Sequence, residues 1–232
     1  MKRIERYITK RYVKQFHSDG RPEVLKAGWI RKMMNRLHLS PREVVEYDCG
    51  SGRILSELSR HYPAINFKGY DTSPQAINIA RKQMGNRLEF FETDFISWAP
   101  GVTDLLLVIN VLEHVPDYYE LLESLRTKAS NFIFYVPLDL SCRSLLRPKL
   151  LKEQRESSGN IHYFSKEMVM WMMEDAGYEI VDWYYAKPIG DVDKAKGLNT
   201  KIRKTVRNIS FFLSKEKAVR WWGGYSLLIA AK

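Results

Sequence analysis

The chain has 232 residues, of which 45% are hydrophobic, and a formal net charge of +10. This length and composition predict one α/β domain with a full core. Two cysteines, Cys49 and Cys142, lie far apart without metal-ligand spacing, and no leader pattern opens the chain, so we expect neither a disulfide framework nor a zinc site, and a cytoplasmic location. The longest apolar stretch, near 105–109, is far shorter than the roughly 20 residues of a membrane-spanning helix, which leaves at most peripheral membrane contact.

The positive charge is concentrated in two segments that flank an acidic centre. Residues 1–43 carry a net charge of +8 and residues 187–220 carry +7, whereas residues 44–186 carry −6. The distribution therefore says more than the total charge, which by itself would suggest nucleic acid. We expect the flanking segments to bind a partner and the central region to carry the chemistry.

Strand-like apolar runs alternate with helical patterns along the chain. Two basic N-terminal helices are predicted near 3–16 and 24–37. Strands are predicted at 43–47, 65–71, 87–94, 104–110, 131–137, 178–185 and 225–231, and helices at 52–61, from a Ser73 cap onward, at 116–128 and at 165–176. This alternation predicts a parallel sheet covered on both faces, with ligands bound outside the carboxyl ends of the strands.

The first strand runs into the glycine turn EYDCGSG, residues 46–52. Gly50 and Gly52 allow a ligand to approach the backbone, and the free N–H groups of the next helix can bind a carboxylate or phosphate. A plain tight turn is the alternative. The turn lacks a full G-x-G-x-x-G, which argues against a dinucleotide.

Acidic residues follow the next two strands. Asp71 ends the second strand, where a carboxylate can accept from both ribose hydroxyls; a helix-capping role is the alternative. Asp94 and Phe95 follow the third strand, where a carboxylate can accept from an adenine amine and an aromatic ring can pack on the base. Asp94 can also be an ordinary helix cap.

The fourth strand leads into VINVLEHVPD, residues 108–117. In this order and spacing, the stretches VVEYDCGSG, GYDTSPQAINIAR, ETDF, LLLVINVLEHVPD and IFYVP resemble the class I S-adenosylmethionine-dependent methyltransferases, within them the subgroup with an L-E-H-V-x-D motif. The resemblance covers about 42–137, and the last two predicted strands are similar to the closing strands of that family. It implies a Rossmann-like sheet of seven mostly parallel strands in the order 3-2-1-4-5-7-6, with the seventh antiparallel and helices on both faces.

The resemblance also implies a cofactor, S-adenosylmethionine, with S-adenosylhomocysteine as the product, and a set of binding residues. The cofactor loop corresponds to Glu46, Asp48, Gly50 and Gly52, the ribose contact to Asp71 and Thr72, the adenine pocket to Asp94 and Phe95, and the position beside the methionine moiety to Asn110. Asp48 departs from the family, which usually has glycine there. Its carboxylate can clash with the cofactor or pair with its ammonium or sulfonium, so we expect an affinity that is retained but altered.

Two histidines are the candidate bases if the acceptor is a hydroxyl. His114 lies in the turn after the fourth strand and His162 follows the fifth strand. A packed structural role is the alternative for both. Glu113 and His114 also resemble a metal-binding pair of ubiquinone-pathway O-methyltransferases, but Asn110 stands where those enzymes have a further glutamate, so no metal is predicted.

The acceptor is expected to contact three basic segments of a single methyltransferase domain, 1–232. These are the N-terminal helical region 1–43, an acceptor loop 138–164 and an insert 187–222, which surround a cofactor-binding core 44–137. Their charge suggests an anionic acceptor such as a nucleotide-linked sugar, a phosphorylated metabolite, a lipid-linked glycan or a phosphate backbone; solvated helix faces are the alternative. The insert alternates apolar and basic residues, a pattern that suits a membrane surface or a helix docked on the core.

These observations favour methyl transfer to oxygen on an anionic small-molecule or glycan acceptor. RNA methylation is the second reading, which the flanking charge would suit. Against it, the chain shows no appended RNA-binding module, no N/D-P-P-Y motif and no Pro-Cys nucleophile, since Cys142 follows a serine. A non-catalytic cofactor-binding module is the third reading, supported only by Asp48.

Overall fold

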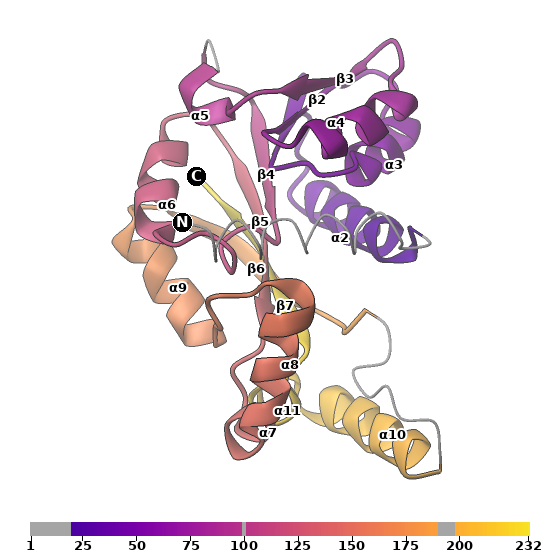
Figure 1. The fold of residues 1–232 in the computed structure, drawn as a ribbon, viewed down its shortest axis with the longest axis vertical. Coiled ribbons are helices and arrows are strands. Elements are labelled where there is room, and N and C mark those ends of the chain that lie inside the picture. The colour runs from indigo at the N-terminus through magenta and orange to yellow at the C-terminus, as the bar shows by residue number, and fades with distance from the viewer. Residues whose placement is uncertain (1–19, 99–100, 190–197) are drawn as a thin grey trace.

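The computed structural model describes residues 20–98, 101–189 and 198–232 (Figure 1). Within them, seven strands form one sheet in the order β3-β2-β1-β4-β5-β7-β6. The strands are β1 Glu43–Tyr47, β2 Asn66–Asp71, β3 Leu88–Glu92, β4 Leu105–Ile109, β5 Phe132–Leu138, β6 Ile180–Ala186 and β7 Tyr225–Ala231. Neighbours among β1 to β5 are parallel, whereas β7 is antiparallel to both β5 and β6. The predicted Rossmann-like order is confirmed.

Helices cover both faces of the sheet (Figure 1). One face carries α2 Arg21–Arg36, α3 Arg53–His61 and α4 Pro74–Ala80, which the 3-10 turn Arg81–Gln83 extends; the other carries α5 Phe95–Trp98, α6 Tyr118–Arg126 and α9 Lys166–Asp175. The predicted helix near 3–16 lies outside the described residues. Two separate apolar clusters, one under each set of helices, account for this three-layer arrangement.

Side-chain caps fix where several helices begin. Ser73 accepts from the Ala76 N–H at 3.3 Å, as predicted for the start of α4, and Asp117 accepts from the Glu120 N–H at 3.0 Å. Asp117 therefore moves the start of α6 to Tyr118, two residues after the Pro116 predicted to open it. These caps place the strand-to-helix turns at the carboxyl ends of the parallel strands.

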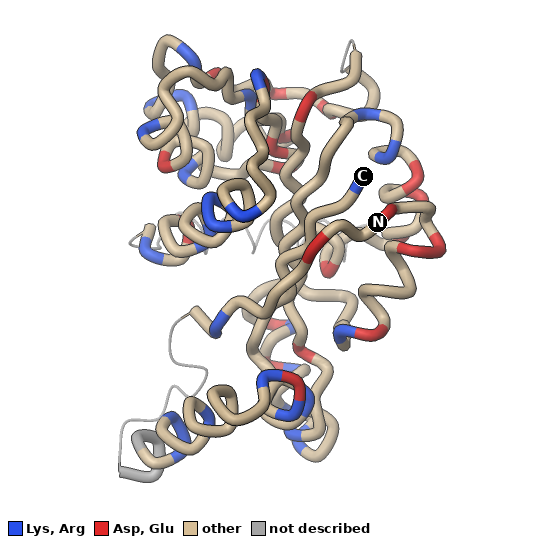
Figure 2. Tube along the Cα trace, turned by 180° about the vertical axis from the view of Figure 1, so that it is seen from behind, with Lys and Arg blue, Asp and Glu red and all other residues tan. Residues whose placement is uncertain are grey.

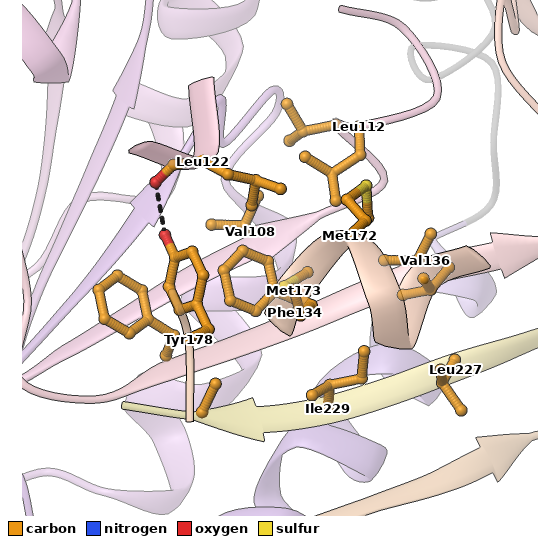
Figure 3. Packing of buried hydrophobic residues seen from close by; sticks show 14 of the residues in the cluster. Val108, Leu112, Leu122, Phe134, Val136, Met172, Met173, Tyr178, Leu227 and Ile229 are labelled. Atoms are coloured by element: carbon orange, nitrogen blue, oxygen red, sulfur yellow. Dashed lines mark hydrogen bonds between the residues drawn. The ribbon is translucent and has the colours of Figure 1, made fainter. Parts of the chain in front are cut away.

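The core beneath α6 and α9 joins the two halves of the sheet. Figure 3 shows Val108 and Phe134 from the parallel strands packed with Met172 and Met173 of α9 and with Ile229 of β7. The hydroxyl of the buried Tyr178 donates to the Leu122 carbonyl at 2.8 Å, which satisfies the polar end of an otherwise apolar ring (Figure 3). The apolar core is thus continuous from the parallel strands β4 and β5 to the last strand, β7.

The predicted acceptor loop 138–164 is largely helical. It contains α7 Cys142–Leu146 and α8 Pro148–Ser158. Ser141 and Ser144 form a reciprocal capping box at the start of α7, Pro148 occupies the first turn of α8, and Gly159 ends α8 with a φ of 79°. The basic insert likewise contains α10 Leu198–Leu213 and α11 Lys215–Trp222. These four helices gather at one end of the molecule (Figure 1).

Lysine and arginine residues are frequent in α2 and in the helices α10 and α11 (Figure 2). Acidic residues are more frequent toward the strands and α6 (Figure 2). None of the helices in the described part of the chain combines the length and apolar character that crossing a membrane requires.

Candidate active site

The predicted cofactor residues meet at one edge of the sheet. Strands β3, β2, β1 and β4 are parallel neighbours. The residues at or just after their carboxyl ends, Asp94, Asp71, Asp48 and Asn110, therefore lie side by side. The sequence spreads these residues over more than sixty positions. The fold brings them to one ligand-sized edge, where open α/β sheets bind their ligands.

The glycine turn is joined directly to Asp71. The N–H groups of Gly50 and Ser73 donate to the two carboxylate oxygens of Asp71, each at 2.8 Å. Gly52 has a φ of 70°, and a Cβ atom there would lie 2.4 Å from the Phe90 ring. The turn therefore needs glycine at residue 52, both for its backbone conformation and for the close packing of α3 on the sheet.

Asp48 fits the turn without breaking it. Its φ is 57°, in the left-handed region that aspartate tolerates better than most residues. Its carboxylate lies beside Asp71, and burial together with this second carboxylate raises the pKa of Asp71 to about 7. The substitution of the usual glycine thus leaves the backbone path intact and adds negative charge at the edge.

We expect Asp48→Gly to stabilise the protein more at pH 8 than at pH 5. The folded pKa of Asp71 lies above its ordinary value of 3.8, so the folded state binds more protons between those pH values and the free energy of unfolding falls as pH rises. Without the Asp48 carboxylate, the free energy of unfolding should fall less as pH rises. At pH 8 we expect Asp48→Gly to be more stable than the parent by about 1–2 kcal/mol. Urea unfolding at both pH values measures the difference. Asp48→Asn is the control that keeps the side-chain size, and an equal effect of either variant at the two pH values would contradict the expectation.

Around the ends of β1 and β4, the same sheet edge carries two glutamates and the side-chain amide of Asn110. Glu46 and Glu113 are buried, each 2% exposed, and the Asn110 Nδ2 group donates to Glu113 Oε1 at 2.8 Å. Among the residues that the structure describes, nothing donates to the buried Oδ1 atom of Asn110. Buried acceptors of this kind suit a ligand that carries positive charge and N–H donors, as the methionine end of S-adenosylmethionine does.

The three residues Asp94, Phe95 and Thr72, which were predicted to contact adenine and ribose, differ in burial and in hydrogen bonding. Asp94 accepts from the Ile96 and Ser97 N–H groups, each at 3.2 Å, and so caps α5. Phe95 is only 2% exposed and packs against Tyr70 at a ring-centroid distance of 5.1 Å, inside the core. Thr72 is exposed beside Asp71. The helix-cap alternative for Asp94 is therefore present in the structure, and contacts of these three residues with a cofactor stay predictions.

The two candidate histidines lie beyond the edge. His114 Nδ1 is 3.3 Å from the Gly159 carbonyl oxygen, and its Nε2 is 3.6 Å from Glu113 Oε1. His162 Nε2 is 3.2 Å from the Pro116 carbonyl oxygen, and its ring lies edge-on to Tyr118. Both rings thus have structural contacts. In the ranges that the structure describes, no three His, Cys, Asp or Glu side chains form a group that could hold a metal ion.

A cavity of about 520 Å³ opens next to Asn110. Its wall includes the end of β5, the helices α7 and α8 and the turn before β7; the lining residues used below are Lys26, Asn110, Tyr135, Asp139, Arg143, Trp222, Tyr225 and Ser226. Neither candidate histidine lines it. The cavity therefore extends from the sheet edge at Asn110 toward the basic helices.

Asp139 is the buried acid of this cavity, and the sequence analysis did not single it out. It is 7% exposed, and Asn160 Nδ2 donates to its carboxylate at 3.3 Å. Burial raises its pKa to about 6, helped by Glu113 and opposed by hydrogen bonds from Gln154 and Asn160. Nearby, the hydroxyl of Tyr135 is hydrogen-bonded to Ser226, and burial raises the pKa of Tyr135. The signal for Asp139 was its place directly after the fifth strand.

Comparison with known proteins decides the family. The profile of the family described as "Methyltransferase domain" matches residues 21–182, which is more than half of the chain. The chain belongs to this methyltransferase family. S-adenosylmethionine is the methyl donor that the motifs predict, and structural neighbours have been crystallised with the product S-adenosylhomocysteine.

The names of two curated relatives indicate different methyl acceptors. Trans-aconitate 2-methyltransferase of Escherichia coli O17:K52:H18 is 36% identical over 86 residues, covering 35% of this chain and 34% of that enzyme. Ubiquinone biosynthesis O-methyltransferase of Paraburkholderia xenovorans is 32% identical over 117 residues, covering 47% and 50%. The chain thus matches half or less of the length of these curated relatives.

Solved structures support the fold over nearly the whole methyltransferase. Magnesium protoporphyrin IX methyltransferase from Synechocystis matches with a TM-score of 0.61 and 14% identity, over 95% of this chain and 92% of that one. The plantazolicin methyltransferase BpumL matches with a TM-score of 0.54 and 15% identity, over 99% and 97%. At such identities the likeness concerns the fold alone.

Proposed function

We propose that the enzyme transfers a methyl group to an oxygen atom of an anionic small-molecule or glycan acceptor held in the cavity beside Asn110. The observation that carries this proposal is the position of the buried Asp139 in a cavity that also borders the cofactor edge. The cationic side chains of Lys26 and Arg143 line the same cavity. Together they offer a proton acceptor and positive charge for an anionic group.

S-adenosylmethionine, when bound, supplies a methyl group on a sulfonium, and transfer requires the acceptor oxygen in line with it. The groups of this chain that hold the donor are the Asp71 carboxylate at the ribose and the Asn110 amide oxygen at the methionine end. Asp139 takes the proton that the acceptor hydroxyl releases. A pKa of about 6 leaves Asp139 ionised at neutral pH and close to the best value for a base. His114 and His162 are the sequence-based alternatives for this role.

The names of two relatives also support a small acceptor. Trans-aconitate and ubiquinone precursors are the acceptors that these names imply, and the second enzyme is named as an O-methyltransferase. We extend only the acceptor class to this chain. The apolar and acidic composition of residues 44–186 fits a small-molecule site better than a phosphate-backbone track.

A methyl-transfer screen tests the proposal. The enzyme is incubated with donor carrying a radiolabelled methyl group and with cell extract separated by anion exchange into neutral, anionic and RNA fractions. We expect label in an anionic small-molecule or glycan fraction, in a bond that resists mild base as an ether does, because Asp139 would take the proton of a hydroxyl. Label released by mild base would indicate a methyl ester, whose formation from a carboxylate needs no base. Label confined to RNA, with binding that weakens steeply in a salt series, would support the RNA reading instead. Donor binding without any transfer would support the non-catalytic reading.

A further inference from the structure

The outward side of α10 is apolar, the reverse of an ordinary surface helix. Its exposed fractions run from 47% at Val206 to 89% at Phe212, and the outer stripe, as we call it, consists of Ile202, Val206, Ile209, Phe212 and Leu213. Four of these residues recur at spacings of four, three and four, which puts them on one side of the helix. The inward side instead holds Arg207 and Phe211, each 9% exposed.

The inward side of α10 is held by specific contacts. The Phe211 ring stacks on Tyr225 at a centroid distance of 5.0 Å and an interplanar angle of 7°. The Arg207 guanidinium lies 5.9 Å from the centre of the Tyr225 ring, and Trp222 Nε1 donates to Ser210 Oγ at 2.9 Å. Rotating the helix to bury its outer stripe would break these contacts. The stripe is therefore a surface feature of the folded chain.

The charge around the stripe is entirely positive on α10. The helix sequence contains no Asp or Glu, while Arg203 and Lys204 lie between the apolar residues of the stripe. Lys215 and Lys217 of α11 continue this basic character, and residues 187–220 carry a net charge of +7. Figure 2 marks lysine and arginine positions in blue along the lower helices. Apolar residues bordered by cations suit the boundary between acyl chains and anionic headgroups.

A second copy of the chain is less well matched to this surface. An isologous dimer through α10 would bring the same basic residues of both copies together. Like charges across an interface oppose association, whereas an anionic lipid surface attracts them.

We propose that α10 lies on the surface of an anionic lipid bilayer with its outer stripe in the interface. One consequence rests on the proposed function. Trp222 and Tyr225, which hold the inward side of α10, also line the cavity beside Asn110. Docking would therefore place the cavity next to the headgroups, and the acceptor would be an amphiphile with an anionic head, such as a lipid-linked glycan.

Vesicle sedimentation tests the docking without any methyl transfer. The full chain is mixed with vesicles of phosphatidylglycerol and phosphatidylcholine in equal parts, and separately with phosphatidylcholine alone. We expect binding to the anionic vesicles only, weakened by salt, and a loss of about tenfold or more in the double variant Phe212→Ser, Leu213→Ser. The matched control is Val102→Ser, Trp171→Ser, which removes two apolar side chains that are 66% and 61% exposed elsewhere. This control should bind as the parent does.

Several outcomes would overturn the docking proposal. They are no sedimentation of the parent with anionic vesicles, or equal binding by the stripe variant and the parent. A parent that is dimeric in analytical ultracentrifugation, with a monomeric stripe variant and no vesicle binding, would make the stripe a self-association surface. The acceptor is tested separately by offering the enzyme the chloroform-soluble and aqueous fractions of one extract. Label only in the aqueous fraction would overturn the amphiphile and leave the vesicle result unaffected.

Discussion

Replacing Asp71 by asparagine is expected to weaken S-adenosylmethionine binding by about 100-fold or more. The carboxylate accepts from the Gly50 and Ser73 N–H groups and is also hydrogen-bonded to Asp48, and the proposed ribose contact needs both of its oxygens as acceptors. In asparagine, one oxygen becomes an NH₂ group that faces a backbone N–H donor. The asparagine NH₂ group and the backbone N–H would then be two donors facing each other, and one oxygen that could accept from a ribose hydroxyl would be lost. Isothermal titration with S-adenosylhomocysteine measures the change.

The matched control for Asp71 is Asp94→Asn, which changes the neighbouring carboxylate at the same sheet edge. Its loss should be smaller, about tenfold or less, because the Asp94 carboxylate caps α5 and the predicted adenine contact would be a single hydrogen bond. Only the ionised form of Asp71 offers all its acceptor positions, and its pKa is about 7. The affinity of the parent should therefore rise from pH 6 to pH 8, and Asp71→Asn should lose this dependence. An affinity of Asp71→Asn within about threefold of the parent would refute the ribose contact.

Replacing Asp139 by asparagine is expected to lower kcat by about 100-fold or more and to leave cofactor affinity unchanged. Asparagine has nearly the same size and can still accept from Asn160, but it cannot take a proton from the acceptor. The parent rate should rise with pH through about 6, where Asp139 loses its proton and becomes a base. Asp139→Asn should lack this rise. Rates measured from pH 5 to pH 8, on the labelled acceptor fraction, report both effects.

The control variants for Asp139 are the histidines His114→Gln and His162→Gln. A base other than Asp139 would show itself as a loss of the same size in one of these variants, with Asp139→Asn unaffected. Asp139→Glu should recover part of the rate, since it restores a carboxylate in the cavity. Calorimetric binding of S-adenosylhomocysteine to Asp139→Asn, equal to that of the parent, separates a catalytic loss from misfolding.

The fold was predictable because each level of the sequence agrees with the next. The apolar strands β1, β4, β5 and β7 are buried along nearly their whole length, and residues such as Ser73 and Gly177 mark where helices begin or end. The strand order came from the family resemblance, and the structure confirms it. The helices α7 and α8 were missed because their apolar residues are few and exposed, so they give no clear period; Leu145 and Leu146 are 61% and 76% exposed.

The candidate site was predictable where it depends on strand ends alone. Asp71 and Asn110 follow strands, and the parallel register brings them to one edge. The direction of a side chain is decided by tertiary packing, and the local sequence pattern does not predict it. Phe95 is therefore only 2% exposed, and His162 lies against Tyr118. Asp139 follows a strand too, but its importance depends on the cavity that α7 and α8 enclose.

The position of β7 has a consequence for how the protein is made. This strand is synthesised after both β5 and β6, yet it lies between them and hydrogen-bonds to both. Until it leaves the ribosome, β5 and β6 each expose a row of unpaired backbone groups, and Trp222 and Tyr225 cannot yet wall the cavity. The nascent chain is thus most prone to aggregate when β5 and β6 have emerged and β7 has not, and the cavity beside Asn110 is completed only by the insertion of that strand.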